Sequence, residues 1–96
     1  MGLFDLFSKK ETINILGVEF PMFDGKQTWA ESRNTSQYQR KNYYYRVDQD
    51  KLYNYQSKLA EYGFMKATEV RYDRENAYVI VEEKDDRLHI AFHVKK

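Results

Sequence analysis

The sequence predicts an α+β fold: an antiparallel sheet of about four to five strands, most of it a C-terminal meander, with one long amphipathic helix packed on one face. Three observations lead to this prediction. Residues 48–64 carry a capped helical pattern, residues 66–94 alternate apolar and polar side chains, and 96 residues suffice for one modest core but not for two. We therefore expect a single domain over residues 11–96, preceded by a flexible or interfacial segment at residues 1–10.

Composition limits the classes of partner and compartment. The chain has 16 basic and 15 acidic residues and a formal charge of +1, which favours neither nucleic acid nor membranes globally. It has no cysteine, which excludes disulfides and cysteine-bound zinc, and no apolar run long enough to span a bilayer. We expect a soluble cytoplasmic protein, and the Lys, Asn, Tyr and Ile usage suggests a bacterial source. The 17% of aromatic residues suit half-buried sheet faces and interfaces.

The helix is the best-defined element. Asp48 offers the short acceptor side chain of an N-cap, and Gly63 stands where a left-handed residue ends a helix. Phe64 follows it and is placed to contact Leu59, as in a Schellman ending. The apolar stripe, at spacings of three and four residues, consists of Leu52, Tyr55, Leu59 and Tyr62. Start, stripe and end therefore agree on one helix.

The N-terminal third gives weaker signals. Residues 3–10 combine a few apolar side chains with two lysines, as interfacial helices do, but the apolar set is too small for stable membrane contact. Residues 12–20 alternate like a strand, with a bulge or tight turn at Gly17. The Asp-Gly dipeptide that follows is a strong turn signal and predicts a hairpin in which Phe20 lies opposite Trp29.

Four strands are expected in the rest of the chain. Residues 30–37 are polar and aperiodic, so we expect a surface loop there, and residues 38–47 alternate as a strand. The strands after the helix are expected at residues 66–72, 77–83 and 87–94. A turn at 85–86 and another within 73–76 would fix their register. The resulting pairs are Val81–Ile90 and Val79–Phe92 in one hairpin, and Val70–Val79 and Thr68–Val81 in the other.

The face opposite the helix remains uncovered in this predicted fold, because one helix cannot cover both sides of a sheet. Its cross-strand rows are Arg71–Tyr78–His93, Glu69–Ile80–Ala91 and Ala67–Glu82–His89. An apolar centre with a rim of Tyr, Arg and charged residues is typical of protein interfaces. The leading hypothesis is a small non-enzymatic module that binds another protein or its own copy, as in a homodimer. The candidate contact residues are Arg71, Tyr78, Ile80, His93, Glu69 and Ala91.

The alternative hypothesis is that the chain binds single-stranded nucleic acid. Between Glu31 and Asp48 there is no acidic residue, and basic residues are interleaved there with tyrosines, above all in the strand at residues 38–46. Such mixtures bind phosphates and stack on bases. The residues that would carry this binding are Arg40, Lys41, Tyr44 and Arg46. The overall charge lacks the basic excess usual for nucleic-acid-binding domains, which favours the protein-binding hypothesis.

Catalysis and metal binding have little support in the sequence. Glu82 beside His89 could act as an acid–base pair, in which the carboxylate would raise the histidine pKa, but no nucleophile is predicted nearby. His89 and His93 lie on one strand at a separation of roughly 13 Å, too far apart to bind one metal ion. We therefore expect no catalytic residues, no metal and no cofactor.

Overall fold

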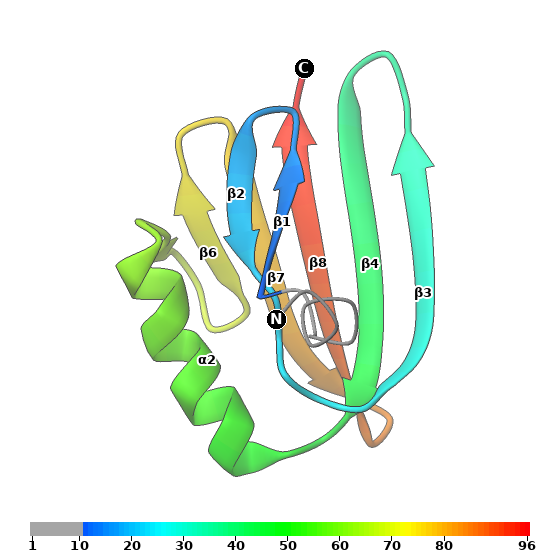
Figure 1. Cartoon of the computed structure of the whole chain (residues 1–96), viewed down its shortest axis with the longest axis vertical. Helices are drawn as coiled ribbons and strands as arrows, with labels where there is room; N and C mark the ends of the chain where they lie inside the picture. Colours follow the sequence, from blue (N-terminus) through cyan, green and yellow to red (C-terminus); the bar gives the residue numbers. More distant parts are fainter. Residues whose placement is uncertain (1–10) are drawn as a thin grey trace, which may run out of the picture.

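Six antiparallel strands form the main sheet of the computed structural model, which describes residues 11–96 (Figure 1). The strands, in the spatial order β3-β4-β8-β7-β6-β5, are β3 (Gln27–Asn34), β4 (Tyr38–Arg46), β8 (Arg87–Lys95), β7 (Ala77–Lys84), β6 (Arg71–Arg74) and β5 (Met65–Lys66). The other elements are the hairpin of β1 (Thr12–Ile15) and β2 (Val18–Pro21) and the helix α2 (Gln49–Glu61). The α+β class and the antiparallel sheet are confirmed, with more strands than expected. The expectation for residues 1–10 lies outside the described residues.

Helix α2 and the β1–β2 hairpin lie on the same face of the main sheet, called the inner face below. Phe20 of β2 stacks on Phe92 of β8 with ring centroids 4.8 Å apart, and on Phe64 at 5.2 Å. The Tyr55 hydroxyl of α2 donates to the Pro21 carbonyl at 2.6 Å and joins the helix to the hairpin. None of the helices and strands within residues 11–96 lies over the opposite side, the outer face.

The predicted caps of the helix are present. The Asp48 side chain accepts a hydrogen bond from the Lys51 N–H at 3.1 Å. At the other end Gly63 has a φ of +86°, and the Phe64 N–H donates to the Leu59 carbonyl at 3.0 Å, which is the Schellman bond. The helix proper is shorter than residues 48–64, because the cap residues are not themselves helical.

The β7–β8 hairpin has the predicted register. Asp85 and Asp86 have φ values of +52° and +61°, which identify a two-residue type I′ turn. The pairs Val81–Ile90 and Val79–Phe92 are therefore confirmed.

The β6–β7 hairpin differs from the prediction by a two-residue slip. Tyr72 rather than Val70 pairs with Val79, because the turn occupies only Glu75 and Asn76 instead of residues 73–76. A slip of two keeps the same side chains on each face. Tyr72 is consequently buried at 5% exposure, whereas Val70 lies outside the strands at 37%.

The N-terminal half departs further from the sequence prediction. The expected tight turn at Gly17 is confirmed, but it joins two separate strands, and Phe20 pairs with Ile13 rather than with Trp29. Residues 30–37 are not simply a loop, because β3 extends to residue 34. Every residue of β3 is exposed, so this strand has no alternation of buried and exposed side chains that a sequence pattern could reveal.

Candidate functional site

The outer face carries side chains from β3, β4, β8, β7 and β6. Alternation along each strand decides which residues reach this face. On β4 they are the even-numbered residues, because Tyr43 and Tyr45 pack against the inner core. The residues of β4, β8 and β7 that face outward near the centre are Tyr38, Arg40, Asn42 and Tyr44, then His89, Ala91 and His93, then Tyr78, Ile80 and Glu82.

A continuous stack crosses this face and takes one residue from each of β6, β7, β8 and β4. The Arg71 guanidinium lies 4.0 Å from the centroid of the Tyr78 ring. Tyr78 stacks on His93 at 4.4 Å with 14° between the ring planes, and His93 stacks on Tyr38 at 4.6 Å and 25°. Both ring faces of His93 are therefore covered, and only 9% of this residue is exposed. We call these four residues the Arg–Tyr–His–Tyr stack.

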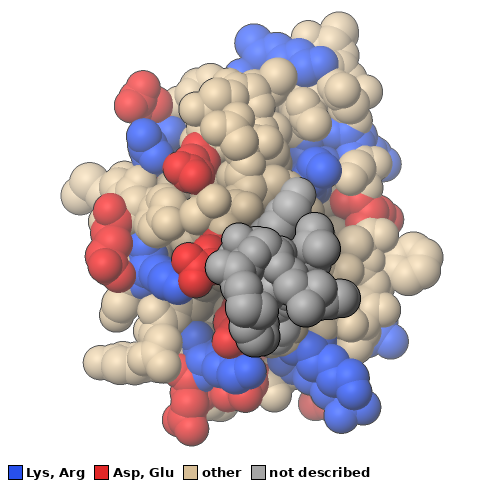
Figure 2. All heavy atoms as spheres, viewed as in Figure 1, with Lys and Arg blue, Asp and Glu red and all other residues tan. Residues whose placement is uncertain are grey.

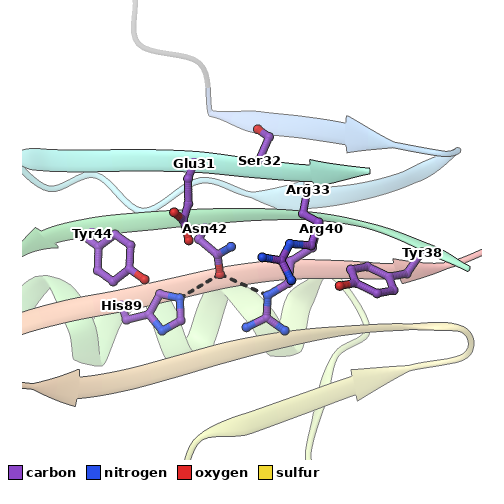
Figure 3. Close-up of a pocket in the computed structure, with 8 residues that line it drawn as sticks. All are labelled: Glu31, Ser32, Arg33, Tyr38, Arg40, Asn42, Tyr44 and His89. Atoms are coloured by element: carbon purple, nitrogen blue, oxygen red, sulfur yellow. Dashed lines mark hydrogen bonds between the residues drawn. The ribbon is translucent and has the colours of Figure 1, made fainter. Parts of the chain in front are cut away.

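A hydrogen-bonded group lies beside the stack (Figure 3). The Asn42 amide oxygen accepts from Arg40 Nε at 3.1 Å and lies 3.0 Å from His89 Nε2. Because an amide oxygen only accepts, this contact places the proton of the neutral His89 ring on Nε2. Arg40 also donates from Nη1 to the Tyr78 hydroxyl at 3.3 Å, and Tyr44 stacks on His89 at 4.6 Å. Arg40 thus connects the two aromatic groups.

Both histidines are neutral near pH 7. Burial lowers the pKa of His93, and the nearby charges of Arg40, Arg71 and Lys95 lower it further. Burial and Arg40 likewise lower the pKa of His89. Histidines with such depressed pKa values pack as uncharged aromatic rings at neutral pH.

Basic side chains outnumber acidic ones on the outer face. The basic side chains on its strands are Arg33, Arg40, Arg46, Arg71, Lys84, Arg87 and Lys95, and the acidic ones are Glu31, Asp73 and Glu82. The side that carries the β1–β2 hairpin instead shows both signs interspersed (Figure 2). The near-neutral total charge therefore hides a basic face.

Two open grooves lie on the outer face. One, of about 370 Å³, runs between β3, β4 and β8 and is lined by Glu31, Ser32, Arg33, Tyr38, Arg40, Asn42, Tyr44 and His89 (Figure 3). The other, of about 510 Å³, lies near the β7–β8 turn. At the first groove the pKa of Arg33 is raised, chiefly by its side-chain hydrogen bond with Tyr38. This bond connects β3 to the Tyr38 end of the stack.

The structure brings together only part of the predicted protein-binding set. Arg71, Tyr78, Ile80 and His93 share the outer face, but Glu69 lies in the segment between β5 and β6, where it forms an exposed ion pair with Lys66. Ala91 is on the outer face but fully buried, at 0% exposure, as expected for a small residue in a central strand. The exposed apolar centre predicted from Ile80 and Ala91 is thus reduced to the half-buried Ile80.

The alternative set for nucleic acid is divided between two faces. Arg40, Tyr44 and Arg46 face outward, whereas Lys41 pairs with Phe92 and belongs to the inner side. The strand prediction for these residues was correct, so the division follows directly from the alternation of side chains along β4.

The Glu82–His89 pair occurs in the predicted register but not with the predicted electrostatics. The carboxylate alone would raise the pKa of His89, yet burial and Arg40 outweigh it and the net direction is downward. The Nε2 atom of His89 contacts Asn42 rather than Glu82. Within residues 11–96, no cluster of three or more His, Cys, Asp or Glu side chains is placed to bind a metal ion.

Tyr38 of the stack, Asn42 of the hydrogen-bonded group and Arg33 beside them were not among the contact residues predicted from the sequence. The alternating pattern of residues 38–47 already assigned Asn42 a face. What the sequence did not give was the position of β4 next to β8, which brings these side chains to the histidines. Strand order depends on long-range packing and leaves no local signal.

Comparisons of the chain with known protein families, with curated proteins and with solved structures give no significant match. In the part of the chain that the structure describes, no helix has the length and apolar character needed to cross a membrane.

Proposed function

We propose that this chain is a non-enzymatic binding module that recognises an acidic segment of another protein across the outer face of its sheet. The observation that carries the proposal is the Arg–Tyr–His–Tyr stack on a face that no element within residues 11–96 covers. Tyrosine and arginine are the residue types most often found at the energetic centre of protein interfaces.

The stack supports binding because its side chains are ordered before a partner arrives. Immobilising a flexible side chain on association costs roughly 0.5–1.5 kcal/mol. Arg71 is held by the Tyr78 ring and by Asp73, whose carboxylate accepts from Nε at 2.6 Å. Arg40 is held by Asn42 and Tyr78. A partner that meets these arginines therefore loses less entropy than with free arginines.

The basic excess of the outer face indicates the chemistry of the partner. Arginine binds carboxylates in a bidentate geometry. Arg71 at one end of the stack and Arg33, which bonds to Tyr38 at the other end, have further N–H donors for this purpose. Tyr78 and Tyr38 add hydroxyl groups between them. Aspartate and glutamate side chains spaced along an extended segment match this arrangement.

Single-stranded nucleic acid is the second candidate, because the same basic side chains would attract phosphates. Base recognition on such modules depends on open aromatic ring faces. Here both faces of His93 and of Tyr78 are occupied, and one face of Tyr44 lies on His89. The rings of His93 and Tyr78, at the centre of the face, therefore present only their edges to an incoming ligand, which suits a protein partner better than a stacked base.

The proposal can be tested by selecting ligands from a display library of random dodecapeptides against the whole chain. We expect the selected peptides to be acidic, and we expect Arg71→Glu to weaken their binding by about tenfold or more, as for a central interface residue. The matched control is Lys58→Glu in the exposed last turn of α2, which makes the same charge change on the other side and should leave the affinity unchanged.

A parallel titration with a fluorescent single-stranded oligonucleotide distinguishes the two candidates. Tight binding that falls steeply with salt and is lost in Arg46→Glu would transfer the function to nucleic acid. Selected peptides without an acidic bias, or acidic peptides indifferent to Arg71→Glu, would contradict the proposed function.

A further inference from the structure

Strand β3 forms one edge of the main sheet and is exposed along all eight of its residues. Within the described chain, no strand pairs with its free side (Figure 1). The other edge strand, β5, has only two residues. Short strands, prolines and lysines are the usual protections of sheet edges against pairing with another chain. Residues 27–34 contain neither proline nor lysine, and the β-bulge of β3 lies at its start, between Gln27 and Trp29, so residues 30–34 are open to strand addition.

The backbone groups available on this edge follow from the turn into β4. The Thr35 N–H donates to the Tyr38 carbonyl at 2.8 Å, so Thr35 directs its backbone groups toward β4. In an antiparallel ladder successive residues alternate between the two neighbours, and Glu31 and Arg33 therefore bond to β4 as well. The residues that direct their N–H and C=O groups to the open side are Ala30, Ser32 and Asn34.

We propose that two copies of this chain associate by antiparallel pairing of their β3 strands about a two-fold axis at Ser32. Ser32 then pairs with Ser32 of the partner subunit, and Ala30 pairs with Asn34 of the partner subunit. The open-side backbone groups of Ala30, Ser32 and Asn34 all obtain partners in this arrangement. The two six-stranded sheets become one continuous sheet. The result is a closed, isologous dimer, the commonest symmetry of soluble oligomers.

Side-chain charges select this register over its neighbours. With the axis at Ser32, Glu31 lies directly opposite the partner's Arg33 on the outer face, and the symmetry repeats the pair. A slip by one residue disrupts the backbone pairing, so the next possible registers differ by two. One of these places Glu31 against the partner's Glu31, and the other places Arg33 against the partner's Arg33. Like charges directly opposite each other destabilise a strand pair.

The remaining side chains fit the same register. On the inner side the facing residues are small or short, since Ser32 meets its own copy and Ala30 meets the partner's Asn34. On the outer side Trp29, which is 58% exposed, lies opposite the partner's Thr35 and loses part of its contact with water. Arg33 has enough N–H donors to bind the partner's Glu31 while it keeps its hydrogen bond with Tyr38.

Charge exchange at residues 31 and 33 tests the proposal. The wild-type chain should sediment as a dimer, at twice 11.7 kDa, at high concentration. Glu31→Arg and Arg33→Glu each replace two attractive pairs by two repulsive ones and should raise the dissociation constant by about tenfold or more. The double variant Glu31→Arg/Arg33→Glu restores opposite charges across the axis and should associate nearly as well as the wild type.

A mixture of the two single variants gives the sharpest outcome. One variant strand carries only positive charge at these positions and the other only negative charge, so the mixture should form heterodimers more tightly than either variant forms homodimers. A backbone test is Ser32→Pro, which removes the central N–H donor and should abolish the dimer. Proline is tolerated on edge strands, and a thermal melt would show whether this variant folds.

This inference does not depend on the proposed function. Arg71→Glu lies on another strand and should leave the dimer unchanged, which separates failure of one proposal from failure of the other. A wild-type chain that stays monomeric at millimolar concentration would overturn the β3 dimer. So would a dimer whose stability is the same in the wild type, both single variants and their mixture.

Discussion

His93 shows how a titratable residue becomes part of a packed aromatic layer on a sheet face. Its imidazole lies between Tyr38 and Tyr78, with ring centroids 4.6 Å and 4.4 Å away. Its Nδ1 atom is buried and has no hydrogen-bond partner within the described chain. The charges that act on the ring, those of Arg40, Arg71 and Lys95, are all positive and therefore disfavour its protonation. The neutral ring is therefore the form that the fold stabilises.

Acidification should consequently destabilise the protein through His93. Its folded-state pKa lies below the unfolded value of about 6.5, so the unfolded chain binds more protons as the pH falls through this value. The contribution of the neutral His93 ring to the free energy of unfolding is complete above about pH 6.5 and is lost progressively below it. The loss amounts to about 1.4 kcal/mol for each pH unit that separates the two pKa values.

Replacement of His93 by phenylalanine isolates this effect. His93→Phe keeps an aromatic ring between the tyrosines but cannot titrate, so its free energy of unfolding should change less between about pH 7.5 and 5.5 than that of the wild type. Urea denaturation at both pH values measures the difference, and His89 remains in both proteins as a common background. An equal pH dependence in the two proteins would show that His93 does not carry the effect.

At the scale of elements, the sequence predicts those features that local chemistry determines. The caps at Asp48 and Gly63 defined the helix, and the Asp85–Asp86 turn defined the β7–β8 register. The β6–β7 register was missed because residues 73–76 offered several turn positions. The structure selects the one in which Glu75 takes a φ of +49° and Tyr72 enters the core. Burial of the larger Tyr72 side chain, a long-range effect, decides between registers that look alike locally.

Truncation of Tyr72 and Val70 tests this register directly. Tyr72→Ala removes a ring that is 5% exposed and should lower the free energy of unfolding by about 3–5 kcal/mol, as for other large aromatic core residues. Val70→Ala changes a side chain outside the strands and should cost no more than about 0.5 kcal/mol. Chemical denaturation of both variants measures the contrast. A larger cost for Val70→Ala would favour the alternative register.

At the scale of the whole molecule, the sequence predicted that only the helix covers the inner face, whereas the structure has both the helix and the β1–β2 hairpin there. The β1–β2 hairpin is a separate sheet that does not pair with the main one. Its position therefore depends on packing alone, which the strand pattern of the sequence does not reveal. Similarly, β3 has no buried residue, and its place beside β4 could not be read from hydrophobic alternation. The candidate site could not be predicted in full for the same reason, because β4, which brings Tyr38, Asn42 and Tyr44 beside the two histidines, is far from β8 in sequence.

The attachment of the hairpin to the rest of the molecule depends on Phe20. This ring is fully buried and stacks on both Phe92 of the main sheet and Phe64 beyond the helix, so it joins all the layers of the inner side. Phe20→Ala should therefore lower the free energy of global unfolding by about 3–5 kcal/mol, measured by urea denaturation. Glu19→Ala, in the same strand but exposed, is the control and should stay within about 0.5 kcal/mol of the wild type. If the hairpin were only a loose cover, Phe20→Ala would release it in a separate transition and leave the main unfolding transition at its wild-type midpoint. A single transition shifted to lower urea would instead mean that hairpin, helix and sheet unfold together, as one shared core requires.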